Sequence, residues 1–429
     1  MDINKMKSLN AFISFNPAVT NGKQIGQASV KTAALDGTSF ALADNICTTT
    51  LKTTCASRTL EAYQPAFGSI AGQKLEDKGA LLVGKTNMDE FGMGTWGQSS
   101  YFGAVKNPWN EKHTAGSGAA AAVACGAVTL ALAADRLGEV RQAAAYCGVI
   151  GLKPTYGRVS RSGLIDCAPS LEQLGIIAKD SASLAAALET ISGHDPKDTT
   201  SFKTEVPPYV NLSQEKLNSV KVAVPEEWKA FADVAGLNKT IFQVKTVSLQ
   251  FFKHALVTAY IIAAVEAFSS MSNFDGVRFG LRGEGKHLQE MYRLTRTKGF
   301  SSLVKEFLTF GALISYGKYY KDYFLRAQKM RSIIKKELED CLQQYDLLLV
   351  PAVPFNAPSL ENGVTGSKLP DNAAYYSAAA NLSGLPAITC PLPGYGAAEG
   401  LPAAGLQLMA KAWNETLLLQ TVRFLEKEQ

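Results

Sequence analysis

The chain has 429 residues, of which 46% are hydrophobic and 19% charged, a composition typical of a globular protein that excludes a disordered one. The net charge of +5 is mild and comes without a dense lysine and arginine block, so any contact with nucleic acid is expected to be indirect. Seven cysteines without a CxxC pair and four scattered histidines favour reduced thiols in a cytoplasmic protein, and we expect neither a metal nor a cofactor. The N-terminus has no apolar signal segment, and the apolar run 119–134 is too short to span a bilayer, so no membrane association is expected.

Apolar runs and turn signals along the chain predict alternating strands and helices. Residues 80–83 form a short apolar run bounded by a turn, which predicts a buried strand. Small residues fill 119–134, and because small side chains let backbones approach closely, we expect one buried helix there, followed by a loop at 135–139. Further strands are expected at 220–224, 244–249 and 347–350, and helices at 226–237, 251–270 and 316–345. This alternation favours an α/β architecture.

Nine sequence segments carry a family resemblance that extends over nearly the whole chain. They are LNAFISF (9–15), DNICTTTLKTTCASRTLEAYQPAF (44–67), GALLVGKTNMDEFGMG (79–94), KNPWN (106–110), GVIGLKPTYGRVSRSGL (148–164), FDGVRFG (274–280), YYKDYFLRAQKMRSII (319–334), NLSGLPAI (381–388) and GLQLMAKAWNETLLL (405–419). In this order they resemble the amidase signature family, and within it the A subunits of glutamyl-tRNA(Gln)/aspartyl-tRNA(Asn) amidotransferases. The resemblance implies one domain over residues 1–429, with a large mixed, twisted sheet wrapped by helices. It also implies that the family's N-terminal helices are missing before a strand that starts at Leu9, and that the region 225–245 is shortened.

The residues at the family's catalytic positions depart from the family pattern. Members use a serine nucleophile, a second serine that relays its proton, and a lysine that accepts the proton. The resemblance places the nucleophile at Glu139 in DRLGEVRQ (135–142), the second serine at Ala115, and the lysine at Ala43 in LADN (42–45). Alanine neither accepts nor relays a proton, and a glutamate nucleophile would form an anhydride that nothing at the other two positions helps to hydrolyse. We therefore expect amide hydrolysis to be absent.

Positions around the expected pocket also differ from the family. The resemblance places the arginine that holds the carboxylate of glutamine at Glu306 or Phe307, and the aspartate that holds its ammonium at Ala374. The candidate residues for a remodelled ligand pocket are Glu139, Asp135, Arg141, Trp96, Gln98, Asp44 and Phe307. A carboxylate beside Arg141 could bind a small polar ligand, whereas the simpler interpretation is an ion pair of Arg141 that fills the vacated pocket. Lys85, in GKTN as in the family, is interpreted as a structural lysine.

These residues are compatible with three functions. The first is a catalytically inactive amidase-like pseudoenzyme that acts as a scaffold or partner subunit in a heteromeric complex, so a protein partner is expected. The second is an amidase-fold protein whose pocket around Glu139 has been repurposed for a small polar ligand or for new catalysis. The third is the A subunit of a tRNA-dependent amidotransferase that still hydrolyses glutamine, and the replaced residues make it the least favoured.

Overall fold

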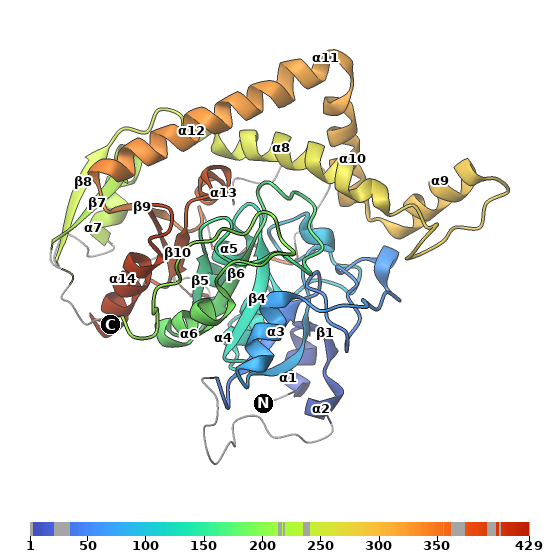
Figure 1. Ribbon diagram of the computed structural model, residues 1–429, viewed down its shortest axis with the longest axis horizontal. Coiled ribbons are helices and arrows are strands. Elements are labelled where there is room, and N and C mark those ends of the chain that lie inside the picture. The colour runs from blue at the N-terminus through green and yellow to red at the C-terminus, as the bar shows by residue number, and fades with distance from the viewer. Residues whose placement is uncertain are drawn as a thin grey trace.

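The computed structural model describes residues 3–20, 35–212, 217, 219–234, 241–354, 356–361, 374–392, 400–402 and 405–428 (Figure 1). Within these ranges an 11-stranded mixed sheet has the order β1-β3-β2-β4-β6-β5-β10-β11-β9-β7-β8. The strands are β1 Phe12–Phe15, β2 Ser39–Ala43, β3 Leu81–Thr86, β4 Leu130–Asp135, β5 Ile150–Lys153, β6 Gln173–Ala178, β7 Val220–Pro225, β8 Phe242–Val247, β9 Leu347–Pro351, β10 Ala387–Cys390 and β11 Leu406–Ala410. The predicted α/β class with a large mixed sheet is confirmed.

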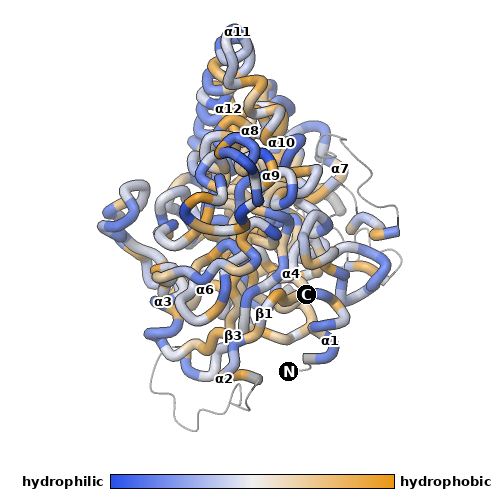
Figure 2. The backbone as a smooth tube through the Cα atoms, turned by 90° about the vertical axis from the view of Figure 1, so that its right-hand side faces the viewer, coloured by the Kyte–Doolittle hydropathy of each residue, from blue (hydrophilic) through white to orange (hydrophobic). Residues whose placement is uncertain are grey.

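Helices cover the sheet on both faces. They are α1 Ile3–Ser8, α2 Pro17–Thr20, α3 Ile70–Asp77, α4 Gly118–Ala124, α5 Glu139–Cys147, α6 Ser181–Ile191, α7 Lys229–Val234, α8 Ala255–Ser270, α9 Leu288–Gly299, α10 Ser302–Ser315, α11 Gly317–Tyr319, α12 Leu325–Gln344, α13 Ala378–Ser383 and α14 Glu415–Glu428. Helices α8, α10 and α12 form an arm that extends beyond the sheet, with α11 at its end (Figure 1). Figure 2 shows that hydrophobic segments concentrate inside the molecule, whereas α12 and α9 carry long hydrophilic stretches.

Within the described ranges, the two largest hydrophobic cores lie on opposite faces of the sheet. Strand β9 illustrates the division, because Leu347 and Leu349 belong to the core that includes α3 to α6 and α14. The alternate residues Leu348 and Val350 belong to the core that includes α8, α10, α12 and α13. Since successive side chains of a strand point to opposite faces, a strand buried on both faces is apolar throughout. This explains why β3 and β9 were visible as continuous apolar runs. The strands predicted at β7 and at the partly exposed edge strand β8 are also confirmed, and the ends of all four are shifted by a few residues.

The prediction of one helix over 119–134 is wrong. Helix α4 ends at Ala124, the chain turns at Gly126 with φ of +71°, and the remaining residues from Leu130 form the central strand β4. β4 lies between β2 and β6 and is almost wholly buried, so it needs small apolar residues just as a buried helix does. Periodicity cannot separate a short buried strand from a buried helix, and that is the physical reason for the error.

Other boundaries also differ from expectation. The N-terminal strand begins at Phe12 and not at Leu9, and α1 precedes it. The helix expected at 316–345 is divided into α11, a π-helical turn at Tyr320–Phe324, and α12. The helix expected at 226–237 is a 3-10 turn followed by α7, and residues 235–237 lie outside the described ranges.

Helix α8 lies within Phe252–Asn273, a stretch long and apolar enough by composition to cross a membrane. In the fold it packs against α10, α12 and α13. Ala259, Ile262 and Ala263 along this helix are fully buried. Packing in the core therefore accounts for the apolar residues on its inner side, while Val257 and Phe268 of the same helix are exposed.

Candidate functional site

The candidate site lies where β4 ends and α5 begins. Asp135 is the last residue of β4, residues 136–138 form a tight turn, and Glu139 is the first residue of α5. Gly138 closes the turn with φ of +115°, a conformation that residues with a Cβ atom rarely adopt. A Cβ atom at this position would also overlap the hydroxyl of Ser377. The turn therefore brings the Glu139 side chain back over the residues that precede it.

The Glu139 carboxylate accepts hydrogen bonds from the backbone N–H groups of this turn. Its Oε2 accepts hydrogen bonds from the backbone N–H of Arg136, at 2.7 Å, and of Leu137, at 2.8 Å. Its Oε1 accepts from the Arg136 guanidinium at 3.2 Å, in an ion pair whose side chains are 5% and 15% exposed. Adjacent backbone N–H groups in a turn form an anion-binding site, and here the chain's own carboxylate is the anion.

Arg136 links this carboxylate to the rest of the site. Its Nη1 lies 3.2 Å from the Cys167 sulfur, and its Cζ lies 5.7 Å from the centroid of the Phe307 ring. Phe307 in turn packs edge-on against Tyr260, with the ring centroids 4.9 Å apart. Thus Phe307, one of the predicted pocket residues, reaches Glu139 through Arg136. The guanidinium is buried and is held by an acid on one side and an aromatic ring on the other.

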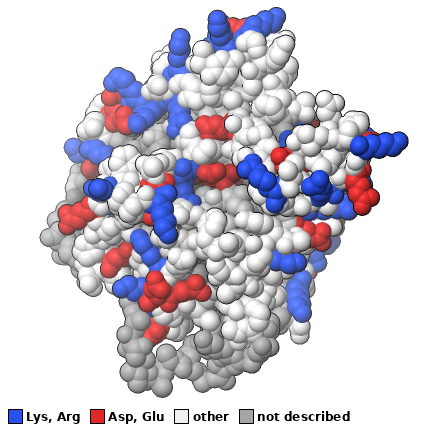
Figure 3. Space-filling view, turned by 45° about the vertical axis from the view of Figure 1, so that its right-hand side comes forward, with Lys and Arg blue, Asp and Glu red and all other residues white. Residues whose placement is uncertain are grey.

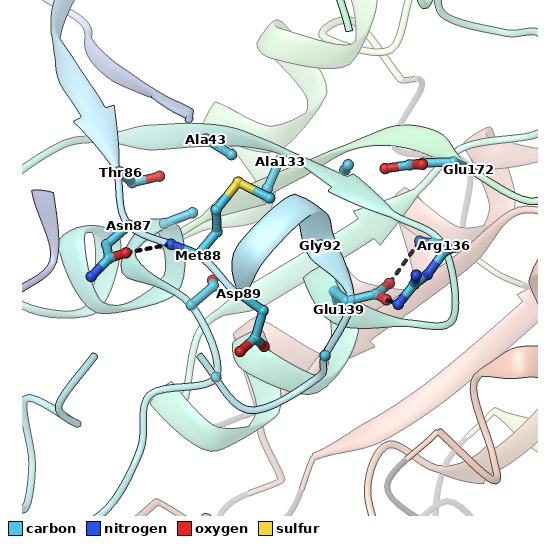
Figure 4. A pocket seen from close by; sticks show the side chains of 15 residues that line it. Ala43, Thr86, Asn87, Met88, Asp89, Gly92, Ala133, Arg136, Glu139 and Glu172 are labelled. Carbon is cyan, nitrogen blue, oxygen red and sulfur yellow. Dashed lines mark hydrogen bonds and ion pairs between the residues drawn. The ribbon is translucent and has the colours of Figure 1, made fainter. Parts of the chain in front are cut away.

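A small cavity of about 30 Å³ adjoins these residues (Figure 4). Its lining residues are Ala43, Thr86, Asn87, Met88, Asp89, Gly92, Gly94, Gly116, Ser117, Ala119, Ala133, Ala134, Arg136, Glu139 and Glu172. Figure 4 shows Glu139 and Arg136 facing each other at one side of the cavity. A volume of this size holds about two water molecules. The structure thus brings Ala43 and Glu139 to one cavity, and the buried Ala115 immediately precedes the lining residue Gly116.

Glu172 is a site residue that sequence reasoning missed. It lies directly before β6, it is 1% exposed, and its Oε2 accepts the backbone N–H of Cys167 at 2.9 Å. Burial raises the pKa of Glu172 to about 7, and the nearby Asp166 carboxylate adds to the increase. Burial also raises the pKa of Glu139, while the Arg136 guanidinium opposes that increase. An acidic residue directly before a fully buried strand was the available signal in the sequence.

Asp135 and Arg141 pair with each other and do not line the cavity. Arg141 donates to both carboxylate oxygens of Asp135, from Nη2 at 2.8 Å and from Nε at 3.0 Å. Its remaining donors reach Gln407 Oε1, Asn381 Oδ1 and the Ser377 carbonyl at 2.6, 2.6 and 3.0 Å. Burial alone would raise the pKa of Asp135, but the Arg141 guanidinium lowers it below the usual value. The ion pair fixes α5 and α13 to the sheet and is fully enclosed.

Asp44 and Lys85 form a second enclosed pair outside the cavity. The Lys85 Nζ lies 3.5 Å from Asp44 Oδ1 and 2.9 Å from Thr53 Oγ1, and neither charged side chain is exposed. Asp44 Oδ2 accepts the backbone N–H of Thr54 at 2.9 Å and that of Ala56 at 3.3 Å. The contacts of Lys85 agree with its interpretation as a structural lysine. Burial raises the pKa of Asp44 and lowers the pKa of Lys85.

Trp96 and Gln98 belong to a loop that wraps the Asp89 carboxylate. The backbone N–H groups of Trp96, Gly97, Gln98 and Ser99 donate to Asp89 at 3.0, 2.7, 2.9 and 2.9 Å. Asp89 lines the cavity, whereas Trp96 and Gln98 do not. Trp96 and Gln98 therefore contact the cavity only indirectly, through their backbone hydrogen bonds to Asp89. Among the described residues, no group of three or more histidine, cysteine, aspartate and glutamate side chains is placed to hold a metal ion.

Comparisons with known proteins assign this chain to a family. Residues 3–419 match the family model described as Amidase, so the chain belongs to the amidase family. It is 39% identical over 415 residues to the A subunit of glutamyl-tRNA(Gln) amidotransferase from Halothermothrix orenii, a match that covers 93% of this chain and 86% of that protein. It is 38% identical over 431 residues to the protein of the same name from Natranaerobius thermophilus, and that match covers 96% and 86%.

Solved structures agree with this assignment. The crystal structure of the A subunit of glutamyl-tRNA(Gln) amidotransferase from Thermotoga maritima superposes with a TM-score of 0.81 at 32% identity, covering 99% of this chain and 90% of that chain. A 6-aminohexanoate cyclic dimer hydrolase superposes with a TM-score of 0.82 at 22% identity over 99% of this chain and 92% of that chain, which shows a common fold alone. The predicted resemblance to the amidase signature family and to its A subunits is confirmed.

Proposed function

We propose that this chain is an A-type subunit of a heteromeric complex related to glutamyl-tRNA(Gln) amidotransferase, and that it acts there as a scaffold without hydrolysing glutamine. The observation that carries the proposal is the carboxylate of Glu139 bound to the backbone N–H groups of Arg136 and Leu137. Its relatives bear the name of a subunit, which supports a protein partner.

The chemistry of amide hydrolysis explains why this carboxylate matters. Attack on an amide carbonyl creates an oxyanion, and enzymes stabilise it with backbone N–H groups aimed at that oxygen. In this turn two such groups already donate to Glu139 Oε2, so they are not available to a substrate. A substrate oxyanion placed beside them would also meet the negative charge of the carboxylate. The position of Glu139 therefore opposes the charge that the reaction must develop.

The remaining catalytic positions offer no replacement groups. The family resemblance assigns proton transfer to positions 43 and 115, and both residues are alanine. Lys85, the lysine in the family-like segment GKTN, is paired with Asp44 and does not line the cavity. A proton acceptor must lie within hydrogen-bond distance of the group it serves. These features support a chain that has kept the amidase fold and lost the amidase reaction.

The size of the cavity also bears on the alternatives. Pockets that bind small organic molecules usually have volumes of several hundred Å³, roughly ten times or more the 30 Å³ found here. A repurposed ligand pocket around Glu139 is therefore less favoured than the scaffold role. We further place the protein in the cytoplasm, with no cofactor and with nucleic acid contacted through its partners, on the basis of its seven free cysteines and mild charge.

A second candidate function is retained glutamine hydrolysis, and the names of the relatives favour it. The two candidates separate in one assay. We would purify the chain alone and with the remaining amidotransferase subunits of its native host, and measure ammonia released from glutamine. The scaffold proposal predicts a stoichiometric complex and no ammonia above the protein-free blank, while the Thermotoga maritima relative serves as the active control. Ammonia release that disappears in the Glu139→Ala variant would overturn the proposal.

A further inference from the structure

The end of the helical arm is the most exposed apolar part of the described molecule. We call residues 313–329 the arm tip; they comprise the end of α10, α11, the π-helical turn Tyr320–Phe324 and the start of α12. Tyr316 is 79% exposed, Leu313 54% and Tyr323 49%. Figure 1 shows that this segment lies at the end of the arm farthest from the sheet. Large exposed apolar patches on a folded protein mark interaction sites.

The aromatic rings of the arm tip are held in place by one another. The rings of Tyr319 and Tyr323 lie 6.1 Å apart, and those of Tyr320 and Phe324 lie 5.1 Å apart. The π-helical turn that carries them contacts both α8 and α10, so the rings are presented on a packed base. Ordered tyrosines lose little conformational entropy on binding and are frequent among the residues that dominate binding energy. π-helical turns are likewise frequent at functional sites.

The charge of the arm tip identifies the kind of surface that it fits. Its cationic side chains are all exposed, and they are Lys318, Lys321, Arg326 and Lys329. Asp322 is its one acidic residue, and it lies 3.9 Å from Arg326. The arm tip therefore carries more than half of the net charge of +5 of the whole chain. Figure 3 shows the cationic side chains at the top of the molecule, where the arm ends. Complementary charge steers two protein surfaces together and fixes their register.

We propose that the arm tip is the docking site for an acidic protein surface on a partner subunit. The proposal rests on the function proposed above, since it names where the partner of that complex binds. A protein fits better than RNA, because Leu313 and Leu325 expose aliphatic side chains and the arm ends in a narrow projection (Figure 2). Single-stranded nucleic acid is usually held in a positively charged groove with aromatic side chains at its floor.

Two pairs of substitutions test the arm tip with the remaining amidotransferase subunits of the native host as the binding probe. Tyr316→Ala with Tyr323→Ala removes the two most exposed aromatic rings of the arm tip and is expected to raise the dissociation constant by about tenfold or more. Lys318→Glu with Lys321→Glu is expected to weaken it as well and to reduce its dependence on salt. The control is Lys335→Glu with Lys336→Glu, which changes the net charge equally on the far part of α12. It also breaks the exposed ion pairs to Glu339 and Asp340, and it should leave binding within about twofold.

The outcomes distinguish the proposed docking site at the arm tip from the proposed function as a subunit of a complex. Because the substituted arm-tip side chains are exposed, both arm-tip variants should keep the thermal unfolding midpoint of the wild type, which checks that folding is intact. If both arm-tip variants bind the subunits with the affinity of the wild type, the docking site is overturned and the proposed function stands. Failure of the wild type to bind any of those subunits overturns both. A fluorescent poly-uridine RNA that binds the wild type and is released by the arm-tip changes, with subunit binding unaffected, would overturn the protein docking site and assign the arm tip to RNA.

Discussion

Glu139 Oε2 lies 2.8 Å from the backbone nitrogen of Leu137, so the first side chain of α5 closes the turn that leads into its own helix. The same oxygen accepts the backbone N–H of Arg136 at 2.7 Å. One side chain thus stabilises the turn and occupies its anion-binding amides. These two roles make its replacement informative about both stability and chemistry.

Glu139→Ala should destabilise the protein. The substitution leaves the backbone N–H groups of Arg136 and Leu137 without this acceptor in a buried turn, and it removes one anion beside the Arg136 guanidinium. We expect the free energy of unfolding to fall by about 2–4 kcal/mol, because hydrogen bonds to charged groups are worth more than neutral ones. Urea denaturation at neutral pH measures it. Glu139→Gln keeps one acceptor oxygen and should lose less; equal stability of the alanine variant and the wild type would contradict the role of the carboxylate in the turn.

Arg141→Met should cost more than any change at an exposed ion pair. Arg141 and Asp135 are completely buried, and methionine leaves the Asp135 carboxylate with the Asn381 amide but without its cation. Breaking a buried pair in this way typically costs about 3–5 kcal/mol. The control is Lys106→Met, which breaks a pair to Glu111 whose side chains are about half exposed and should cost less than about 1 kcal/mol. Similar urea midpoints for the two variants would rule out a supporting role for the buried pair.

The sequence could predict much of the framework of this protein because most of its strands are buried on both faces. Residues 347–350 form a continuous apolar run and residues 220–224 an apolar run interrupted only by Lys221, and each became a strand of the sheet. The same property hid β4, because LALAAD continues the alanine-rich run of α4 and has no period that distinguishes strand from helix. Resemblance to a family supplied the order of the segments, which local patterns alone do not contain.

The candidate site was predictable in its positions but not in its contacts. The spacing of the motifs indicated residues 43, 115 and 139, and Ala43 and Glu139 do line one cavity. The partner of Glu139 lay three residues away, at Arg136, because a left-handed glycine at 138 turns the chain back on itself. Arg141 lay nearby in the sequence and nonetheless reaches Asn381 instead of the cavity. Side-chain direction at a helix start depends on the geometry of the preceding turn, which composition does not specify.

Glu172 should give the stability a measurable pH dependence. Its carboxyl group has an ordinary pKa of 4.5, which burial in the fold raises to about 7. Between these two values the folded protein binds the proton more tightly than the unfolded chain, so the free energy of unfolding falls as the pH rises from about 4.5 to about 7. The change from this group is on the order of 3 kcal/mol. Glu172→Gln should flatten that slope, as measured by urea midpoints at pH 5 and pH 7.5.

A difference between wild type and variant isolates this group, because other carboxyl groups with raised pKa values, such as Asp44, are present in both proteins. Glutamine keeps an acceptor oxygen for the backbone N–H of Cys167, so the local hydrogen bond survives. Parallel pH profiles of the two proteins would show that Glu172 is already ionised at pH 5 in the fold.

Gly138→Ala tests whether the turn before Glu139 requires glycine. At φ of +115° an alanine is strained, and its Cβ atom would overlap the Ser377 hydroxyl. Gly126→Ala is the matched control, since Gly126 also has a positive φ, of +71°, but a Cβ atom there meets nothing within 4 Å. We expect the control to cost about 1 kcal/mol and Gly138→Ala about 2–3 kcal/mol more, because strain and overpacking add. Adding Ser377→Ala to Gly138→Ala should recover part of this difference, and equal urea midpoints for the two glycine variants would mean that the turn tolerates a side chain.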